Sequence, residues 1–484
     1  MKRSLVRSQA GAQGAVSSVG RACGLHPQGR RFEPYTAHKF MDYRLEKDIL
    51  TNKTRYFFSL LGPRFEIMNE LMADSLSRHF GCEYKPIYIF SSHPNRHFIK
   101  ENYIILNEHA YDIERNLKEN VVYLQEYEDL NEEFLSSPFI KKLSDQLFKK
   151  QGQVPIYSFT TSFLKVNDPR WLIIGPSPRI ATYYDNKIKH YELFEKLNLP
   201  RNKARIFKNK DDLLRKNHTF PGYITASYTS GGNESGLIYS KKMLENFLSR
   251  LRNINAKDGF LVADIFEHIV TMPNVNAIVT GKNRTYVLVI SDQIMRGNRY
   301  LGNIYPSSIS PKHIRQVKQI TKKIGNHLSK EGYRGLFGCD FLINKNGKLV
   351  VIDLNPRRQG GYACNTLALR ALGINLTDIE LLCALGKVSK ANLVYDDIQY
   401  PAVWAHSKAK PHDPGQRIVK EIKKGDMTSI FLRQGGEYRG TFYVKDSIFI
   451  DGYIGYIVAT GKNREELYNF VLDTADNTIK ETLS

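Results

Sequence analysis

Two aspartates on either side of an apolar hairpin are the strongest chemical signal in this sequence. Residues 340–357 read DFLINKNGKLVVIDLNPR, and Asn346-Gly347 at the centre is typical of a two-residue turn, because both positions of that turn need a positive φ. Directly opposed side chains have Cβ atoms about 4.5–5.5 Å apart, a distance at which two carboxylates repel each other. The predicted register pairs Lys345 with Lys348, Ile343 with Val350, and Asp340 with Asp353. A turn longer or shorter by one residue would remove this opposition, and with it the prediction of a bound cation.

The same strand face carries further groups that suit a cation. Side chains repeat every second residue along a strand, so Asn355 shares the face of Asp353, and Arg357 does too if the strand continues. Carboxylate and amide oxygens suit Mg²⁺, which takes one or two carboxylates and completes its shell with water and substrate phosphates. The alternative is a pair of solvated acids at the end of a sheet. The strands between the acids are strongly apolar, and unpaired charge beside a buried ladder is costly, which favours the metal site.

The elements that must position this hairpin alternate between strands and helices. RYFFSLLGP from residue 55 predicts a strand, residues 66–80 a helix, and PIYIF from residue 86 a second strand, and NVVYL, VPIYSF and WLII are further apolar runs. This pattern predicts one α/β domain over residues 41–185. A helix follows over 186–200, then a β-rich region. Residues 386–484 are predicted to form mainly strands, closed by a helix from residue 464.

Composition excludes several classes of protein. The chain has 484 residues, enough for about three domains. With 42% hydrophobic residues and no apolar run near the roughly 18 residues of a membrane span, it is expected to be a soluble globular protein. Its five cysteines form no C-x-x-C pair, which argues against a disulfide framework or a zinc site. These features favour a reducing, cytoplasmic setting.

The positive charge is concentrated at the start of the chain. Residues 1–40 contain seven basic residues and one acid, and so supply +6 of the net +21, leaving +15 for the rest. This leader has no helical or alternating period, so it is predicted to lie outside the fold. Residues 17–34 resemble the translation of a tRNA gene, which favours Met41 as the natural start; an organelle transit peptide is the alternative. Elsewhere no block of five like charges occurs, which favours a solvated surface over a nucleic-acid groove.

With these motifs the sequence resembles the ATP-grasp superfamily. Members carry an acid on one strand, a hairpin and then the pattern [DE]-x-N-x-R, here residues 353–357. Upstream, WLIIGPSPRIATYYDNKIKHYELFEKLNLPRNKA is similar to the start of the family's core. Downstream, GYIVATGKNREELYNFVLDTA is similar to the C-terminal element of the biotin-carboxylase-like branch. The resemblance spans about residues 55–475 and is firm over 171–361.

The resemblance implies an α+β fold in which two lobes grip ATP. A Rossmann-like α/β domain, residues 41–185, would precede the ATP-grasp core at 186–385, and a small β-rich element at 386–484 would follow. Within the core, the resemblance implies a small lobe at about 186–260 and a large lobe at about 261–385.

The resemblance also implies roles for individual residues. Mg²⁺, or Mn²⁺ in its place, would be held by Asp340, Asp353 and Asn355 and would bridge the phosphates of ATP. Nucleotide-binding residues would be Lys187 at the phosphates, the loop residues Ser227, Ser230, Gly231 and Gly232, Asp264 and Phe266 at the adenine, and Glu267 at the ribose. Residues 223–226 lack the lysine that usually ends the preceding strand, and a plain flexible turn is the alternative for the loop serines.

The reaction implied is the activation of a carboxylate as an acyl phosphate, followed by attack of an amine. Arg357, with Arg358 as second candidate, would stabilise the oxyanion. Substrate-binding candidates are Arg296 and Arg299, which are equally well explained as exposed loop arginines, and the turn glycines Gly360 and Gly361. The implied partners are small-molecule carboxylates and amines, as in amino-acid or peptide ligases, with no membrane or nucleic acid; a homodimer stays open.

Three other functions remain open at this point. One is a biotin-carboxylase-like enzyme that activates bicarbonate; it would need a carrier on a separate chain, since the sequence has no A-M-K-M motif. Another is a nucleotide-binding protein without ligase activity. The third is a basic nucleic-acid-binding protein, whose affinity would depend steeply on salt.

Overall fold

The computed structural model describes most of the chain beyond its first 51 residues. The described residues are 52–61, 66–90, 103–106, 121–122, 131, 134–215, 220–229, 235–251, 256–296, 299–389, 393, 400–408, 438–443 and 453–483. The predicted leader, residues 1–40, and Met41 lie outside them, as do the strands predicted from SIFLRQG and SIFIDG near the C-terminus. Within the described residues, no helix combines the length and apolarity that crossing a membrane requires.

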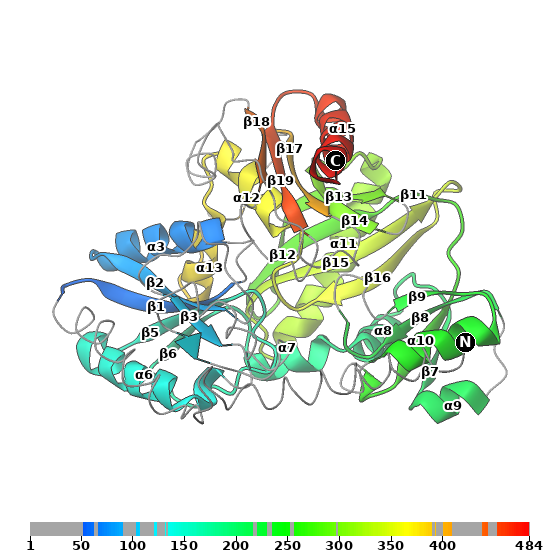
Figure 1. Ribbon diagram of the computed structural model, residues 1–484. Coiled ribbons are helices and arrows are strands. Elements are labelled where there is room, and N and C mark those ends of the chain that lie inside the picture. Colours follow the sequence, from blue (N-terminus) through cyan, green and yellow to red (C-terminus); the bar gives the residue numbers. More distant parts are fainter. Residues whose placement is uncertain are drawn as a thin grey trace, which may run out of the picture.

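The first part of the chain forms a parallel sheet of six strands, in the order β4-β3-β2-β1-β5-β6 (Figure 1). The strands are β1 (Arg55–Leu60), β2 (Tyr84–Phe90), β3 (Tyr103–Leu106), β4 (Val121–Val122), β5 (Val154–Ser158) and β6 (Trp171–Ile174). Helix α3 (Glu66–Phe80) covers one face and α6 (Pro138–Gln151), beside the 3-10 helix η5 (Phe134–Ser136), covers the other. Neighbouring residues of β1 therefore enter different cores: Phe57 packs with α3 and Phe58 with α6. The predicted α/β pattern is confirmed.

A smaller antiparallel sheet follows, in the order β7-β10-β8-β9. Its strands are β7 (Ala204–Phe207), β8 (Gly222–Ala226), β9 (Ser235–Ile238) and β10 (Phe260–Asp264). Helices α9 (Lys210–Arg215) and α10 (Lys241–Arg250) pack on it, whereas α7 (Pro178–Tyr184) and α8 (Lys187–Lys196), which precede it, pack into the core of the third sheet. Asn186 begins α8, because its side-chain oxygen accepts from the Ile188 N–H at 2.9 Å and so satisfies a free donor of the first turn. This cap fixes where the first turn of α8 lies.

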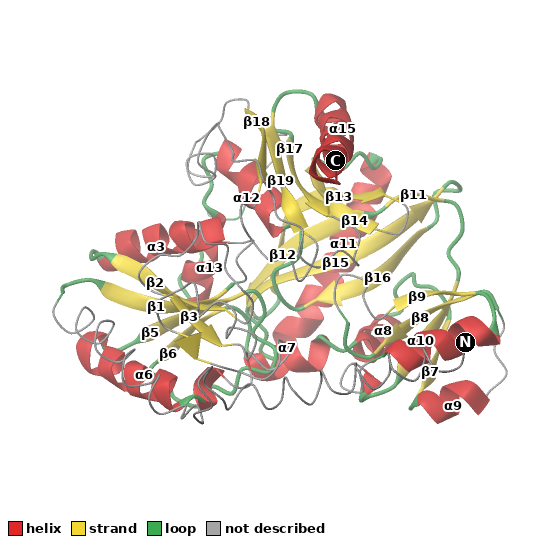
Figure 2. Ribbon diagram, viewed as in Figure 1, coloured by secondary structure: helices red, strands yellow, loops and turns green. Residues whose placement is uncertain are grey.

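The third sheet has nine strands and is the largest (Figure 2). Its strands are β11 (Ile269–Thr271), β12 (Pro273–Gly281), β13 (Arg284–Arg296), β14 (Arg299–Tyr305), β15 (Gly335–Asn344), β16 (Leu349–Asn355), β17 (Ala402–Lys408), β18 (Tyr438–Tyr443) and β19 (Tyr453–Thr460). Its helices are α11 (Pro311–Lys330), α12 (Tyr362–Ala371), α13 (Leu376–Ala384) and α15 (Arg464–Leu483). Strand β17 pairs with β14, so the C-terminal strands extend this sheet.

Alternation along β12 separates a packed face from a polar one. Val275, Ala277 and Val279 are buried in the core that α11 completes with Ile320 and Ile324. The opposite face of β12 carries Asn274 and Asn276, which are 3% and 1% exposed. Buried amides on a strand need partners, and they mark the face on which the paired acids lie.

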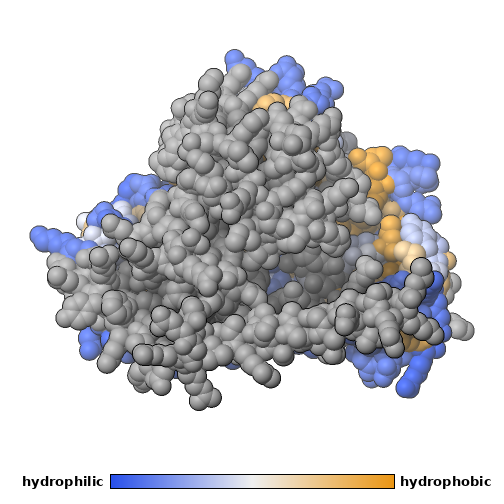
Figure 3. Space-filling model, viewed as in Figure 1, coloured by the Kyte–Doolittle hydropathy of each residue, from blue (hydrophilic) through white to orange (hydrophobic). Residues whose placement is uncertain are grey.

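A few large apolar side chains remain exposed. Ile269 and Val270 on β11 are 46% and 61% exposed. In Figure 3 apolar atoms gather at the right-hand edge, where Figure 1 places β11. The exposed pair lies on the short strand that follows the crossing from the four-stranded to the nine-stranded sheet.

Candidate active site

The hairpin of β15 and β16 brings the two acids together, but through a different register from the one predicted. Asp340 pairs with Asp353, as expected. Near the turn, however, Ile343 pairs with Leu349 and Leu342 with Val350, so the predicted pairs Ile343–Val350 and Lys345–Lys348 are wrong. The turn has three residues, Lys345-Asn346-Gly347, closed by the Gly347 N–H donating to the Asn344 carbonyl at 2.8 Å, with Gly347 at φ +72°.

A β-bulge restores the opposition that the longer turn would remove. Phe341 pairs with Val351 and Asp340 with Asp353, which leaves Ile352 without an opposite residue. The extra residue allows Val351 and Leu354 to enter the same core, while Ile352 is 39% exposed. Two one-residue shifts therefore cancel, and the acids end up opposite each other.

Four side-chain amides surround the carboxylate of Asp340. Asn274 and Gln293 donate to its Oδ1, the latter at 3.1 Å, and Gln359 donates to the same oxygen at 3.4 Å. Asn355 donates to Oδ2 at 3.1 Å. Burial, followed by the charge of Asp353, raises the pKa of Asp340 to about 6 despite these donors. A buried acid with a raised pKa is typical of a functional site.

Asp353 is held from the other side by the first turn of α8. Lys187 Nζ lies 2.7 Å and 2.8 Å from its two oxygens, and His190 Nδ1 lies 2.9 Å from Oδ1. Burial alone would raise the pKa of Asp353, but Lys187 and His190 outweigh it and hold the pKa of that carboxyl well below its usual range. Asp340 thus favours its protonated form more than a free aspartate does, whereas Asp353 favours its ionised form. Lys187 occupies the side of Asp353 that a metal ion would need.

The residues at this site fit a divalent cation that brings further ligands with it. Asn274 Oδ1 and Gln359 Oε1 are buried beside Asp340 without a hydrogen-bond partner among the described residues. Orphaned amide oxygens next to two carboxylates suit a hard cation. Asn355 now points its amide nitrogen at both acids, so it would have to turn its oxygen inward to ligate. Across the described residues, no three His, Cys, Asp or Glu side chains group as a metal cage.

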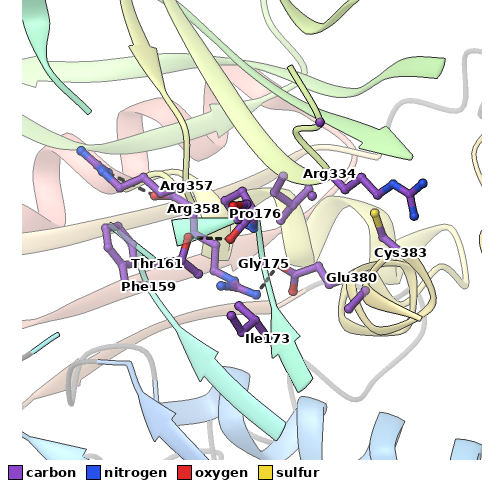
Figure 4. A pocket seen from close by; sticks show the side chains of 15 residues that line it. Phe159, Thr161, Ile173, Gly175, Pro176, Arg334, Arg357, Arg358, Glu380 and Cys383 are labelled. Carbon is purple, nitrogen blue, oxygen red and sulfur yellow. Dashed lines mark hydrogen bonds and ion pairs between the residues drawn. The ribbon is translucent and has the colours of Figure 1, made fainter. Parts of the chain in front are cut away.

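The two adjacent arginines lie in different surroundings. Arg357 Nε lies 3.4 Å from Asp185 Oδ1, and its guanidinium lies 5.4 Å from the centre of the Phe159 ring. Arg358 is 3% exposed and forms an ion pair with Glu380 at 2.7 Å. Figure 4 shows the two side chains leaving the chain in opposite directions. Arg358 is therefore not brought to the acid pair, whereas Arg357 stays next to Asp185, two residues before Lys187.

Arg358 belongs to a buried polar network that joins the first sheet to the third. Its guanidinium donates to the carbonyls of Ser158 and Ile174, from β5 and β6, while Glu380 accepts from Tyr157 at 3.1 Å and from Tyr362 at 2.6 Å. A pocket of about 200 Å³ lies against this network, with Thr161, Gly175 and Arg334 in its wall (Figure 4). The network is a structural junction between the sheets.

The predicted phosphate loop is described only at its start. Ser227 is fully buried: its carbonyl accepts from the Lys187 N–H at 2.8 Å and its hydroxyl accepts from the Asp258 N–H at 3.2 Å. The next residue, Tyr228, lies under Lys257, whose ammonium is 4.6 Å from the ring centre. Ser230, Gly231 and Gly232 lie outside the described residues. The start of the loop and Lys187 are thus adjacent.

The predicted adenine segment crosses between the two antiparallel sheets. Asp264 ends β10. Its N–H donates to the Lys203 carbonyl at 2.9 Å, and its carbonyl accepts from the Asn202 side-chain amide at 3.3 Å. Phe266 lies under the Lys348 ammonium at 5.8 Å, and the Glu267 side chain is 76% exposed. These residues lie where the chain crosses from the four-stranded to the nine-stranded sheet.

The remaining substrate candidates lie beside strand β14. Arg296 ends β13 and pairs with Arg299 at the start of β14. A Cβ added at Gly360 would meet the Tyr300 hydroxyl at 3.0 Å, and one at Gly361 would meet Asn303 at 2.7 Å. Both glycines therefore allow close packing of polar side chains from β14.

Four residues of this site were not predicted from the sequence. Asn274 and Gln293 come to Asp340 from β12 and β13, Gln359 comes from the turn after β16, and His190 comes to Asp353 from α8. Two signals were available: Asn274 and Asn276 interrupt an apolar strand at period two, and His190 follows Lys187 at the i, i+3 spacing that places both on one side of a helix.

The chain resembles carbamoyl phosphate synthases in sequence. It is 24% identical over 280 residues to the large chain from Helicobacter pylori, covering 56% of this chain and 24% of that one. It is 22% identical over 260 residues to the C-terminal section of the Aquifex aeolicus large chain, covering 52% of this chain and 46% of the relative. The chain thus spans less than half the length of these curated relatives.

Solved structures share its fold at low identity. The L-amino acid ligase of Bacillus licheniformis has a TM-score of 0.59 at 14% identity, with 88% of this chain and 98% of that chain covered. Biotin carboxylase of Campylobacter jejuni also has a TM-score of 0.59 at 14% identity, with 88% and 95% covered. The biotin carboxylase domain of the Hydrogenobacter thermophilus 2-oxoglutarate carboxylase, a dimer with MgADP and bicarbonate, has a TM-score of 0.58 at 16% identity, with 83% and 86% covered.

The matched domain coincides with the site. Residues 185–361 match the ATP-grasp domain family, and they run from Asp185 beside Arg357 to the end of the turn that follows β16. The parallel sheet, the two antiparallel sheets and the acid pair between them confirm the predicted α+β architecture. Residues 185–361 are therefore an ATP-grasp domain, in a chain that shares the overall fold of these solved structures.

Proposed function

We propose that the protein is a carboxylate–amine ligase that joins a small carboxylic acid to an amine and releases ADP and phosphate. The observation that carries this proposal is the convergence of Asp340, Asp353 and Lys187 at the boundary of two sheets, with Arg357 close by. Acids that hold a metal, a lysine that holds phosphate and a nearby guanidinium are the groups that phosphoryl transfer to a carboxylate requires.

In the proposed reaction a carboxylate oxygen attacks the γ-phosphorus of ATP, and the bond to the ADP oxygen breaks. The amine nitrogen then attacks the acyl carbon, phosphate leaves with the bonding electrons, and the amine loses a proton. Mg²⁺, held by Asp340, Asp353 and Asn355, would neutralise phosphate charge when bound. Lys187 would leave Asp353 for the phosphates, and Arg357 would stabilise the oxyanion of the tetrahedral intermediate.

Further residues contribute binding in this proposal. The loop that begins at Ser227 would cradle phosphate, the crossing segment with Asp264 and Phe266 would take the adenine, and Glu267 the ribose. The arginines at the β13–β14 turn, Arg296 and Arg299, would bind the substrate carboxylate. Arg358 is withdrawn from the proposed catalytic set, because Glu380 neutralises it in a buried junction.

The test is ADP release from Mg-ATP in the presence of pooled amino acids. The wild type is expected to release ADP only when both an acid and an amine are supplied, and Asp353→Asn is expected to lose at least about 100-fold in rate. Asp378→Asn is the matched control, because Asp378 lies on α13, away from the site, and pairs there with Arg78 of α3 at 2.8 Å. Amine-dependent release that survives in Asp353→Asn would reject the metal assignment.

Bicarbonate is the second candidate for the carboxylate. The Hydrogenobacter domain, which was solved with MgADP and bicarbonate, has a TM-score of 0.58 to this chain. Bicarbonate-dependent ADP release without an amine would favour this candidate over the ligase. ATP binding without ADP release from any pool would point to a nucleotide-binding protein without ligase activity.

A further inference from the structure

Phe163 has a backbone conformation that a bulky residue rarely adopts. Its φ is +65°, in the left-handed region that glycine and asparagine favour. It lies between β5 and β6, and its N–H donates to the Thr182 hydroxyl at 2.7 Å. Residues in such conformations cluster at functional sites, where the rest of the structure holds them. The place to which this backbone brings the Phe163 ring is therefore informative.

The ring lies beside an aromatic residue that belongs to the four-stranded sheet. Its centre is 5.6 Å from the ring centre of Tyr228, which follows β8. The Lys257 ammonium lies 5.0 Å from the centre of the Phe163 ring and 4.6 Å from that of Tyr228. Both distances fall within the range of about 6 Å for a cation–π contact. Lys257 is thus held by two rings, one from the first part of the chain and one from the four-stranded sheet.

Lys257 keeps its positive charge uncompensated in this position. The residue is exposed, and no acid among the described residues forms an ion pair with it. The neighbouring Asp258 instead accepts from the Asn186 side chain at 2.7 Å. Aromatic rings attract a cation without cancelling its charge, whereas the ammonium of Lys187 is neutralised by Asp353. An anion that reaches Lys257 therefore meets a full positive charge.

Hydrogen bonds place Lys257 close to Lys187 at the start of the predicted phosphate loop. Asp258, the residue after Lys257, is bonded to Asn186, and Asn186 directly precedes Lys187. Ser227 bonds both segments, since its carbonyl accepts from the Lys187 N–H and its hydroxyl from the Asp258 N–H. Two lysines beside one loop suit an anion that carries several negative charges. The phosphate chain of a nucleotide is such an anion.

A purely structural role is the competing explanation, in which the cluster only ties the first part of the chain to the four-stranded sheet. Packing alone does not require a charge between the two rings. Methionine has a side chain of similar length and makes favourable contacts with aromatic rings. Lys257→Met therefore keeps the packing and removes the charge, which separates the two explanations.

We propose that Lys257 is a phosphate-binding residue of the nucleotide site and that Phe163 is the positioning residue that holds it there. The inference rests on the proposed binding of phosphates at Lys187 and at the loop that begins with Ser227. It adds a second cation to that site, and it gives the left-handed backbone of Phe163 a function.

The experiment measures the binding of ADP and of adenosine by calorimetric titration of the full-length protein without metal. Lys257→Met is expected to weaken ADP binding about tenfold and to leave adenosine binding within about twofold, because only ADP carries phosphate. Lys257→Arg, which keeps the charge and the contact with the rings, is expected to stay within about threefold of the wild type for both ligands. The matched control is Lys150→Met, since the Lys150 ammonium lies 5.4 Å from the ring centre of Tyr56, in the first sheet.

A second variant tests the positioning role of Phe163. Phe163→Asn removes the ring but places at this position a residue that tolerates the left-handed region. It is expected to weaken ADP binding about 3–10-fold and to leave adenosine binding unchanged. The double variant Phe163→Asn/Lys257→Met is expected to bind ADP as Lys257→Met does, because the ring acts only through the lysine. Additive losses in the double variant would overturn the positioning role.

The same measurements separate phosphate binding from a structural role. If the cluster only joins the two parts of the structure, Lys257→Met changes the melting temperature alone, or weakens ADP and adenosine equally, and either result would overturn the proposal. Unchanged ADP affinity in Lys257→Met, together with a raised KM for the carboxylic acid, would overturn it as well, because the lysine would then bind a different anion.

Failure of this inference can be told apart from failure of the proposed function. Lys187→Met must weaken ADP binding if the phosphates lie where we propose. Wild-type protein that binds ADP no more tightly than adenosine, or Lys187→Met that binds ADP as well as the wild type does, would reject the phosphate site itself. Loss in Lys187→Met with no change in any Lys257 or Phe163 variant would reject only the inference made here.

Discussion

The ammonium group of Lys187 lies 2.7 Å and 2.8 Å from the two carboxylate oxygens of Asp353. The pair joins helix α8 to strand β16, with the lysine side chain 11% and the aspartate side chain 22% exposed. A cation of the protein itself thus neutralises one of the two opposed acids. A metal ion that binds Asp353 must compete with this lysine.

Replacing the lysine should therefore change metal and nucleotide affinity in opposite directions. In Lys187→Met the Mn²⁺ affinity of the nucleotide-free protein is expected to rise about tenfold, because no side chain competes for Asp353. The affinity for ATP is expected to fall, because the phosphates lose their lysine. Calorimetric titration of both ligands measures the two effects. Lys189→Met is the control, since Lys189 pairs with Glu192 at 2.8 Å on the exposed side of the same helix. Weaker binding of both ligands would contradict the competition.

The raised pKa of Asp340 predicts a pH-dependent stability in metal-free protein. Burial and the Asp353 charge raise this pKa from 3.8 to about 6, so the folded protein binds the proton more tightly than the unfolded chain does. The contribution of Asp340 to the free energy of unfolding is therefore present at low pH and is lost as the pH rises from about 4 to 6. Asp353, whose pKa is lowered, is ionised in the folded state throughout this window.

Urea denaturation in EDTA at a series of pH values measures this effect. The free energy of unfolding of the wild type is expected to fall relative to that of Asp340→Asn between about pH 4 and 6. Below about pH 6 the apparent Mn²⁺ affinity is expected to fall about tenfold per pH unit, because the ion competes with the proton. Parallel stability profiles for the two proteins would show that Asp340 titrates normally.

The Arg358–Glu380 pair should matter for stability far more than its sequence position beside Arg357 indicates. Both side chains are nearly inaccessible, at 3% and 4% exposed. Removing one partner leaves the other charge buried and unpaired, so Arg358→Met and Glu380→Gln are each expected to cost about 3–5 kcal/mol. The double variant is expected to lose at least about 2 kcal/mol less than the sum of the two. Equilibrium denaturation of all four proteins measures this, and additive losses would mean that the pair does not interact.

Gly338 is required by the close approach of Gln359. A Cβ at this position would lie 1.9 Å from the Gln359 Cδ atom, so Gly338→Ala must displace a side chain that donates to Asp340. Such overpacking is expected to lower the free energy of unfolding by about 1–3 kcal/mol. Gly236→Ala is the control, since nothing lies within 4 Å of its Cβ position. Shortening the neighbour in Gly338→Ala/Gln359→Ala should recover part of the loss, and no recovery would place the strain elsewhere.

Much of this fold could be predicted because its signals are local. Short apolar runs with turns between them predict the parallel sheet, and the turn at Asn346-Gly347 predicts the β15–β16 hairpin. The opposition of Asp340 and Asp353 followed from that turn, although two compensating shifts produce it. The bulge at Ile352 has no signature of its own, because an apolar residue there looks like part of the ladder.

The rest of the site depends on contacts between distant segments. Asn274 and Gln293 reach Asp340 only because β12 and β13 lie beside β15 in the sheet. Arg358 and Arg357 are neighbours of the same type, and the strand pattern alone could not show that one turns toward Glu380 and the other toward Asp185. Tertiary packing decides which groups share a site, and the periodicity of the sequence carries no signal for it.

The unpaired Ile352 has a consequence for how this hairpin can vary. With the same three-residue turn and no bulge, Asp340 would stand opposite position 352, and Asp353 would move to the other face of its strand. The length of the turn and the alignment of the acids are therefore set independently, by two separate irregularities. A related chain could gain or lose one residue at the tip and keep its acids aligned, provided that a second one-residue change occurs between the tip and the acids.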